Sequence, residues 1–223
     1  MKSLRLGKPW VVRSILVGVF VLGVIMVSNL PVRGDKTVSE EIVIFDFNNS
    51  NQAQNWLIVN DGVMGGVSQS NLVLTPDRTA LFRGNVSLEN NGGFASVRTY
   101  PADYDLADYE GLILHVKGDG HRYKLRLRTN NNLAGIAYQA DFQTRPETWL
   151  RIRIPFEQFV PVYRGFAVPN PPELDRAEIG QIGFMISDKQ AGPFQLEIDW
   201  LKAYRQVIQE PSVDKLWRGK IPW

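Results

Sequence analysis

Residues 111–128 read GLILHVKGDGHRYKLRLR, and this stretch carries the clearest structural pattern in the chain. In its first half Leu112, Leu114 and Val116 alternate with Ile113, His115 and Lys117; in its second half Tyr123, Leu125 and Leu127 alternate with Arg122, Lys124, Arg126 and Arg128. A period of two places alternate side chains on opposite faces of a β-strand. Because Gly118-Asp119-Gly120 separates the two runs, the pattern predicts a β-hairpin with one face in the core.

Similar short runs, punctuated by Gly, Asn, Asp and Pro, lie on both sides of this stretch. They predict further strands at residues 41–47, 67–74, 80–88, 93–99, 136–142, 149–154, 181–187 and 194–204. No run after residue 35 keeps a helical period for three turns, although 155–159 and 175–179 suit single helical turns. Strands without crossover helices predict an all-β fold, an antiparallel sandwich or jelly roll.

Two later segments depart from the strand pattern. Residues 161–172 contain four prolines, and proline lacks the N–H donor of a central strand, so we expect a long, stiff loop. The alternation is lost again after Tyr204. We therefore divide the chain into an N-terminal segment (1–35), a binding domain (41–204) and a C-terminal tail (205–223).

The composition of the chain excludes several classes of function. A chain of 223 residues with 44% hydrophobic and 22% charged residues is long enough to bury a real core as one large β domain. A formal net charge of +2 does not indicate a nucleic-acid-binding protein, which needs a clustered basic surface. The absence of cysteine excludes thiol nucleophiles, thiolate metal sites and disulfides.

The N-terminus has the layout of an export signal or a membrane anchor. Four basic side chains, Lys2, Arg5, Lys8 and Arg13, precede the apolar run from Ile15 to Val27. The run is shorter than the roughly 20 residues that span a bilayer, which favours a cleaved signal peptide. No small-x-small cleavage site follows, however, so we expect an uncleaved hydrophobic helix that anchors the chain. The positive charges ahead of the run keep the N-terminus cytoplasmic and place the domain on the extracytoplasmic side.

The sequence contains no strong pattern of catalytic residues. The two histidines, His115 and His121, flank one turn, and no Gly-x-Ser-x-Gly elbow accompanies them. A metal between them is less expected than a solvated pair. The carboxylates show no pairing motif for glycoside hydrolysis. We therefore expect no catalytic residue, no cofactor and no metal, and a protein that is not an enzyme.

The segment Asn60-Asp61-Gly62-Val63-Met64-Gly65-Gly66-Val67-Ser68 is rich in glycine. Glycines let backbone amides approach a ligand or adopt positive φ, so this loop suits an anion-binding nest. It is not a Walker loop, because no Gly-Lys-Ser/Thr follows. A tight connection in which Asp61 caps a turn explains the same residues equally well.

Basic side chains follow two of the predicted strands. Arg122, Lys124, Arg126 and Arg128 fall on one face of their strand, and Arg151 and Arg153 alternate in the same way. If these strands share a sheet, six positive charges form one surface that favours an acidic partner or anionic lipid. The alternative is a solvated outer face with Asp141 and loop acids as counter-ions.

Several ordered blocks together resemble the complex I intermediate-associated protein 30 family, over about residues 42 to 204. The blocks are Trp56 with residues 60–68, then 111–120, 142–144, Trp149, 154–156, 159–161, 164–165 and 182–194. The resemblance implies a galactose-binding-like jelly roll. Mitochondrial members of the family help to assemble the membrane arm of NADH:ubiquinone oxidoreductase, and plastid relatives embed a similar domain in photosynthetic assembly or translation factors. The N-terminus here differs from an organelle transit peptide and is more typical of a bacterial or cyanobacterial envelope or thylakoid protein.

The resemblance implies a non-catalytic assembly or scaffold factor that binds subunits of a respiratory or photosynthetic membrane complex through its loops. We expect the partner-binding residues to be Asp61, Gly65, Gly66, Arg164, Asp188, Lys189 and Gln190, and in second place Arg122, Arg126 and Arg128. Asp188 and Gln190 have an equally good explanation as residues that hold their loop in place. The rival hypothesis is a carbohydrate-binding module, in which Tyr138, Tyr163 or Trp200 lines a groove. An enzyme that binds a nucleotide at the glycine loop is the third.

Overall fold

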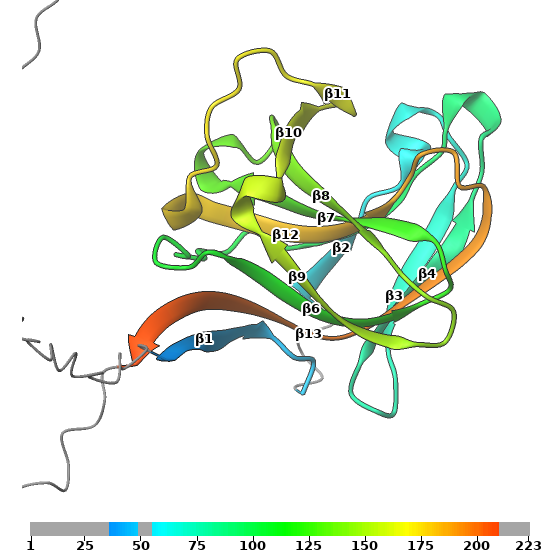
Figure 1. The fold of residues 1–223 in the computed structure, drawn as a ribbon. Helices are drawn as coiled ribbons and strands as arrows, with labels where there is room; N and C mark the ends of the chain where they lie inside the picture. The colour runs from blue at the N-terminus through cyan, green and yellow to red at the C-terminus, as the bar shows by residue number, and fades with distance from the viewer. Residues whose placement is uncertain (1–35, 49–54, 210–223) are drawn as a thin grey trace, which may run out of the picture. The chain divides into compact units, whose positions relative to one another are not determined.

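The computed structural model describes residues 36–48 and 55–209, and this part is an all-β sandwich of two antiparallel sheets (Figure 1). Sheet A contains β1 (Lys36–Phe45), β3 (Gln69–Leu74), β4 (Ala80–Val86), β6 (Gly111–Gly118), β9 (Trp149–Pro155) and β13 (Gly192–Gln209). Sheet B has the order β11 (Phe166–Ala167), β10 (Val160–Tyr163), β8 (Ala137–Gln143), β7 (Arg122–Thr129), β12 (Ile179–Ile186), β5 (Ala95–Thr99) and β2 (Trp56–Ile58). The predicted all-β antiparallel sandwich is confirmed.

Short 3-10 turns connect the strands. They are η2 (Asp61–Met64), η3 (Glu89–Asn91), η4 (Asn130–Asn132), η5 (Phe156–Gln158) and η6 (Arg176–Glu178). The last two confirm the single helical turns predicted at 155–159 and 175–179. Asp175 caps η6 by accepting a hydrogen bond from the Ala177 N–H, which satisfies one of the unpaired donors at the start of a helical turn.

The strand β13 is the spine of sheet A. One of its edges pairs with β6, and the other pairs first with β4, from Gly192 to Ile198, and then with β1, from Leu201 to Gln209. Its 18 residues therefore join three strands from different parts of the chain. Figure 1 shows it curving along the full width of the sheet beside β1 and β6.

The core lies between the two sheets and is built from the inward half of each alternating pattern. Leu112, Leu114, Leu125 and Leu127 are fully buried, as their alternation predicts. Aromatic rings fill one end of the core, where Phe45 meets Trp56 edge to face at a centroid distance of 5.0 Å. The binary pattern thus predicts correctly which side chains face inward.

The predicted hairpin between residues 112 and 128 is wrong. The strand β6 pairs with β13 and β9 in sheet A, whereas β7 pairs with β12 and β8 in sheet B. The Gly118-Asp119-Gly120 segment therefore crosses from one sheet to the other. Alternation fixes the buried face of a strand but not its neighbour, and two facing strands of opposite sheets show the same pattern as a hairpin.

Thr144 builds this crossing. Its Oγ1 accepts a hydrogen bond from the Gly120 N–H at 3.1 Å and donates one to the His121 carbonyl at 2.8 Å. A Cβ at Gly118 would lie 2.5 Å from Thr144 Oγ1, so glycine is needed for the threonine to approach. The crossing also separates the basic strands, because β7 lies in sheet B and β9 in sheet A. The single surface of six positive charges expected for a shared sheet does not form.

The proline-rich segment was predicted as a loop, but the structure places short strands in it. Val160, Pro161 and Val162 pair with β8, and the two-residue turn Arg164-Gly165 leads into β11. Proline is tolerated because these strands are short and lie at the rim of sheet B. The first and last strands are longer than predicted. The strand β1 begins at Lys36, and β13 continues to Gln209, into the segment expected to be a tail.

The expected N-terminal hydrophobic helix (1–35) and most of the expected tail lie outside the described residues. Within the ranges 36–48 and 55–209 there is no helix with the length and apolar character to cross a membrane.

Candidate functional site: a basic cavity on sheet B

The outer face of sheet B forms the floor of a cavity of about 590 Å³, here called the basic cavity. Loops that follow β2, β4, β7, β10 and β12 supply its walls, including Val63, Met64 and Tyr163. Among the described residues that line it, five side chains are basic (Arg98, Lys124, Arg126, Arg128 and Arg164) and one is acidic (Asp188). Its volume falls within the range of small-ligand pockets, roughly 300–1,000 Å³.

Gly183 brings two of the floor arginines together. It lies in β12, in register with Arg98 of β5 on one side and with Arg126 of β7 on the other. A Cβ at Gly183 would lie 2.9 Å from the Cβ of Arg98 and 2.6 Å from the Val97 carbonyl oxygen. The missing side chain therefore leaves a trough between the two guanidinium stems. Arg128 extends the row on β7, in register with Gln181 of β12.

These three arginines are held in a poorly solvated place without acidic partners. Within residues 36–48 and 55–209, no ion pair includes Arg98, Arg126 or Arg128, and Nε of both Arg98 and Arg126 is buried without a hydrogen-bond partner. Burial, together with repulsion from Arg128 and Arg98, lowers the pKa of Arg126 to about 10. Burial also lowers the pKa values of Arg98 and Arg128.

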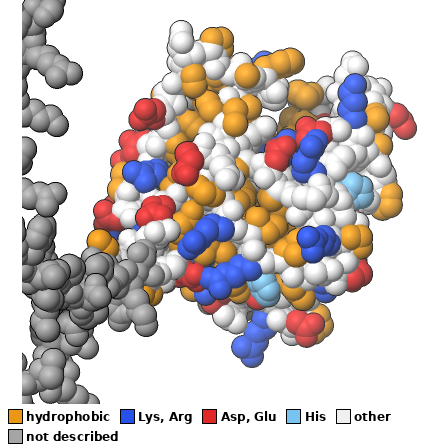
Figure 2. All heavy atoms as spheres, viewed as in Figure 1, with side chains coloured by type: hydrophobic (Ala, Val, Ile, Leu, Met, Phe, Trp, Pro, Cys, Tyr) orange, Lys and Arg blue, Asp and Glu red, His pale blue; other side chains and the backbone are white. Residues whose placement is uncertain are grey.

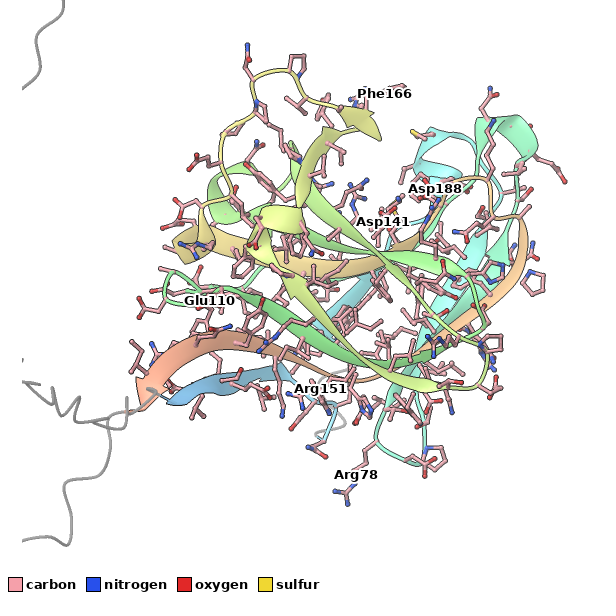
Figure 3. The ribbon with its side chains drawn as sticks, viewed as in Figure 1. Arg78, Glu110, Asp141, Arg151, Phe166 and Asp188 are labelled. Carbon is pink, nitrogen blue, oxygen red and sulfur yellow. The ribbon has the colours of Figure 1, made fainter. Side chains whose placement is uncertain are left out.

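Lys124, which lies on β7 with Arg126 and Arg128, has acidic partners. It is buried, and its Nζ lies 2.8 Å from Asp141 and 2.9 Å from Asp188. Arg122 adds contacts to the same two carboxylates at 3.6 and 3.1 Å. Burial would raise the pKa of the Asp188 carboxyl, but its contacts with Lys124 outweigh this and lower the pKa. Asp141 and Asp188 lie near each other, on the side of the molecule where Phe166 begins β11 (Figure 3).

The glycine loop forms a wall of the cavity and is held by Asp61. This carboxylate is fully buried and accepts hydrogen bonds from the Ser68 N–H (2.9 Å), the Ser68 hydroxyl (2.5 Å), the Gly93 N–H (2.7 Å) and the Phe94 N–H (3.3 Å). Burial alone would raise the pKa of the Asp61 carboxyl, but these hydrogen bonds outweigh it, so the pKa lies below its ordinary value. Asp61 thus fastens η2 to the loop before β5.

Glycines pack directly on this carboxylate. A Cβ at Gly66 would lie 2.4 Å from Asp61 Cγ, and one at Gly92 would lie 2.5 Å from Asp61 Oδ2. Gly65 has φ of +92° with open space around it, and it ends η2 in the left-handed conformation. The loop consequently projects Val63 and Met64 outward, 73% and 61% exposed.

The remaining predicted site residues lie on two turns. Arg164 and Gly165 form the β10–β11 turn with positive φ at both positions, and the Arg164 guanidinium lies 5.3 Å from the centroid of the Tyr163 ring. Asp188 and Lys189 form a second turn of this kind before β13. Gln190 holds that turn, because its side chain exchanges hydrogen bonds with the backbone N–H and carbonyl of Arg122 at 3.0 and 2.7 Å.

The structure therefore gathers part of the predicted set. Arg126, Arg128, Arg164 and Asp188 line the basic cavity, whereas Arg122, Gly65, Gly66, Lys189 and Gln190 lie next to it and Asp61 lies beneath its wall. Arg98, Gly183 and the apolar rim were missed. The sequence predicted a strand at 93–99, which contains Arg98, but no spacing revealed that β5 and β7 both flank β12.

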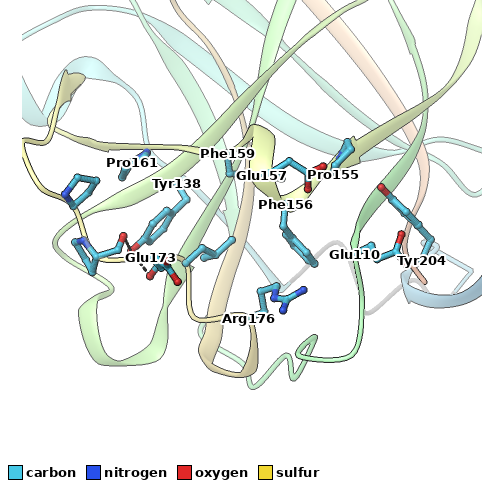
Figure 4. Close-up of a pocket in the computed structure, with 13 residues that line it drawn as sticks. Glu110, Tyr138, Pro155, Phe156, Glu157, Phe159, Pro161, Glu173, Arg176 and Tyr204 are labelled. Atoms are coloured by element: carbon cyan, nitrogen blue, oxygen red, sulfur yellow. Dashed lines mark hydrogen bonds between the residues drawn. The ribbon is translucent and has the colours of Figure 1, made fainter. Parts of the chain in front are cut away.

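A second pocket, of about 710 Å³, lies near the η5 turn (Figure 4). Its lining has the opposite charge balance, with Glu110, Glu157 and Glu173 against Arg176. Its aromatic groups are engaged within the chain: the Tyr138 hydroxyl donates to the carbonyls of Pro172 and Glu173, and Arg176 lies over the Phe156 ring at 5.9 Å. Among the described residues that line this pocket, the one cation, Arg176, donates a hydrogen bond to the Tyr109 carbonyl at 2.7 Å.

The two histidines lie away from the basic cavity. His115 stacks between Trp149 and Trp200, at centroid distances of 4.8 and 5.2 Å, and its Nδ1 lies 2.7 Å from Asp199. His121 Nδ1 lies 3.0 Å from Asp119 at the crossing between the sheets. Among the described residues, no three His, Cys, Asp or Glu side chains are grouped as metal ligands would be.

The curved two-sheet sandwich has the architecture of a jelly roll. Solved structures support this class. The family 11 carbohydrate-binding module of a Clostridium thermocellum cellulosomal cellulase has a TM-score of 0.56 and 18% identity, covering 74% of this chain and 94% of the module. The same type of module, solved with a β-1,3-1,4-mixed-linked tetrasaccharide, has a TM-score of 0.55 and 19% identity, covering 73% and 94%. At these identities the likeness shows the fold alone.

The family is shown by sequence. Residues 45–198 match the family model described as complex I intermediate-associated protein 30, and the chain belongs to this family. The mouse mitochondrial protein of that name is 28% identical, covering 73% of this chain and 56% of the mouse protein. The Drosophila melanogaster protein is 27% identical, covering 73% and 62%. The chain thus matches little more than half the length of these relatives.

Proposed function

We propose that this chain is a non-catalytic assembly factor that binds protein subunits of a membrane complex, of the NADH:quinone oxidoreductase or photosynthetic type. Its family membership supports this proposal, since its relatives are named for association with complex I intermediates. The expected N-terminal anchor would hold the domain at the extracytoplasmic side of a membrane, close to such subunits.

The single observation that carries the proposal is the basic cavity with its apolar rim. Val63 and Met64 are largely exposed, and exposed apolar side chains around a recess are typical of protein-binding surfaces. Figure 2 shows hydrophobic side chains over β10 and β11, with acidic and basic side chains side by side beneath them. This combination gives a partner both apolar contact area and charge to fix its orientation.

The carbohydrate-binding hypothesis receives less support from the residues that were expected to line a groove. Tyr138 is buried. The Trp200 ring stacks with the His115 ring, and the Lys202 ammonium lies 4.4 Å from its centroid. Tyr163 lines the basic cavity, but Arg164 lies over its ring. A sugar platform requires open aromatic faces, and of these three residues only Tyr163, which is 45% exposed, offers part of its ring.

The proposal is tested by capturing the tagged full-length chain from native membranes after mild crosslinking and quantifying the recovered proteins by mass spectrometry. We expect subunits of an oxidoreductase or photosystem to be enriched. The double variant Val63→Ser, Met64→Ser is expected to remove most of this enrichment. Truncating an apolar side chain that becomes buried at the centre of an interface costs about 2 kcal/mol or more of binding free energy. The matched control places serine at Val43 and Ile208, which are also exposed but lie in sheet A.

Recovery of polysaccharide enzymes alone, without membrane-complex subunits, would contradict the proposed function. Equal losses in the rim variant and in the sheet A control would show that the basic cavity is not the binding surface.

A further inference from the structure

The floor of the basic cavity carries positive charge that no residue within 36–48 or 55–209 neutralises. The Arg126 Nη1 donates only a weak hydrogen bond, to Met185 Sδ at 3.3 Å, and the Arg128 Nη1 donates to the Gly135 carbonyl at 2.8 Å. Neither acceptor carries a negative charge. By contrast, Lys124 on the same strand has two carboxylates within 3 Å. Among the described residues, one buried cation therefore has two carboxylate partners and its three arginine neighbours have none.

This arrangement is costly for the isolated protein. A partly buried guanidinium loses hydration, and a second and third one nearby repel it, as the lowered pKa of Arg126 reflects. A carboxylate placed among the three would supply the missing charge and accept the unused donors. Guanidinium groups bind carboxylates with short, directional hydrogen bonds that are stronger than neutral ones. The site is thus arranged for an anion that the described part of the chain does not supply.

The rim indicates which kind of molecule brings the anion. Val63 and Met64 rise beside the arginines, so the ligand must present apolar groups next to its negative charge. A bilayer surface attracts basic groups that stand exposed on the protein surface. Here the three guanidiniums lie on the sheet floor below the loops, where a flexible chain can enter and a flat membrane cannot.

We infer that the basic cavity binds an acidic, apolar peptide segment of a client protein, with a carboxylate side chain among Arg98, Arg126 and Arg128 and its apolar neighbours against Val63 and Met64. This inference rests on the proposed function and adds the chemistry of the client segment. Gly183 provides the space for the carboxylate between Arg98 and Arg126. The volume of about 590 Å³ accommodates a few residues of such a segment.

The test uses a fluorescent peptide in which glutamate alternates with leucine, and a matched peptide with glutamine in place of each glutamate. Binding to the full-length chain in mild detergent is measured by fluorescence anisotropy. We expect the glutamate peptide to bind at least about tenfold more tightly than the glutamine peptide, and R98Q or R126Q to remove most of that difference. The affinity of the glutamate peptide should also fall as salt is added.

The control is R83Q, because Arg83 is an exposed arginine of β4 in sheet A, away from the cavity. It should leave peptide binding unchanged. R126Q should also raise the Tm, since it removes an unneutralised charge from the floor, and this shows that its loss of binding is not a loss of folding.

Equal binding of the two peptides, or equal effects of R83Q and R126Q, would overturn the inference. So would Arg126-dependent binding to phosphatidylglycerol vesicles without binding of the glutamate peptide. If membrane-complex subunits are still captured and the capture is insensitive to R98Q and R126Q, the inference fails while the proposed function stands. If the glutamate peptide binds as expected but no such subunit is captured, the proposed function fails and the peptide chemistry stands.

Discussion

At the scale of single residues, the buried Asp61 carboxylate holds the glycine-rich loop to the segment before β5. The glycine-rich segment predicted an unusual loop, and the loop does form a cavity wall. The sequence left open whether Asp61 caps a turn or meets a ligand. The structure shows a carboxylate that accepts four hydrogen bonds from Ser68, Gly93 and Phe94. Two of these residues lie more than 30 positions away, which no local pattern encodes.

The packing of glycine on this carboxylate leads to a stability prediction. Gly66→Ala would place a methyl group 2.4 Å from Asp61 Cγ, so either the loop or the carboxylate must move. We expect the free energy of unfolding, measured by urea titration, to fall by about 1–3 kcal/mol, as for other overpacked sites.

Gly62→Ala is the matched control, because nothing lies within 4 Å of its Cβ position and its φ is ordinary for an L-residue. It should change the free energy of unfolding by less than about 0.5 kcal/mol. Similar losses in the two variants would show that the loop is sensitive to any side chain and not to contact with Asp61.

At the scale of secondary-structure elements, the sequence predicted faces better than partners. Leu112, Leu114, Leu125 and Leu127 all face the core as expected, because one side of each strand meets the opposite sheet. The pairing of β6 with β7 was wrong because a short glycine-rich segment suits a crossing between sheets as well as a hairpin. The strands β10 and β11 were not predicted, because the prolines in this segment indicated a loop. Pairing depends on long-range contacts such as that of Thr144 with the crossing, which a local pattern does not contain.

The β10–β11 turn gives an element-scale prediction. Arg164 has φ of +50° at the first position of a two-residue turn, where asparagine is better tolerated than arginine. Arg164→Asn should stabilise the hairpin by about 0.5 kcal/mol. Hydrogen exchange of the β10 and β11 amides should then slow about twofold, since 1.4 kcal/mol corresponds to tenfold.

Arg164→Ala is the comparison, because it removes the same charge without favouring positive φ. Exchange in this variant should be no slower than in the parent protein. Slower exchange in both variants would mean that the arginine charge, and not the backbone conformation, destabilises the turn.

At the scale of the whole molecule, the arginines on the two sheets differ in the partners that they contact. In sheet A, Arg151 of β9 pairs with Glu41, and Arg153 donates to Ser39 and lies 3.9 Å from the centroid of Tyr204. In sheet B the three floor arginines have no acidic partner among the described residues. The sequence predicted outward-facing basic strands, but their assignment to separate sheets, and the place of Arg98 beside them, depend on the sheet order.

Acid sensitivity is a further property of the whole fold. The pKa values of Asp61, Asp188 and Glu197 lie below their ordinary values, because hydrogen bonds and cations outweigh the effect of burial. The unfolded chain therefore binds protons more tightly than the folded one. Their stabilisation is complete above pH about 5 and is lost as the pH falls below about 4 toward the folded-state values.

Urea unfolding between pH 7 and pH 3 measures this loss. Asp61→Asn should lower the free energy of unfolding by about 2–3 kcal/mol at pH 7 and flatten its decline with acid. Asp77→Asn, on the exposed turn between β3 and β4, should leave the profile unchanged. An unaltered acid profile in Asp61→Asn would remove Asp61 as a source of the pH dependence.

The position of β13 in the chain has a consequence for synthesis. This strand is the spine of sheet A, yet it is the last one in the described part to leave the ribosome. Until it emerges, β1 and β4 cannot be joined to β6, so sheet A stays incomplete. The sandwich therefore gains its full core only late in synthesis, once residues 192–209 have been made.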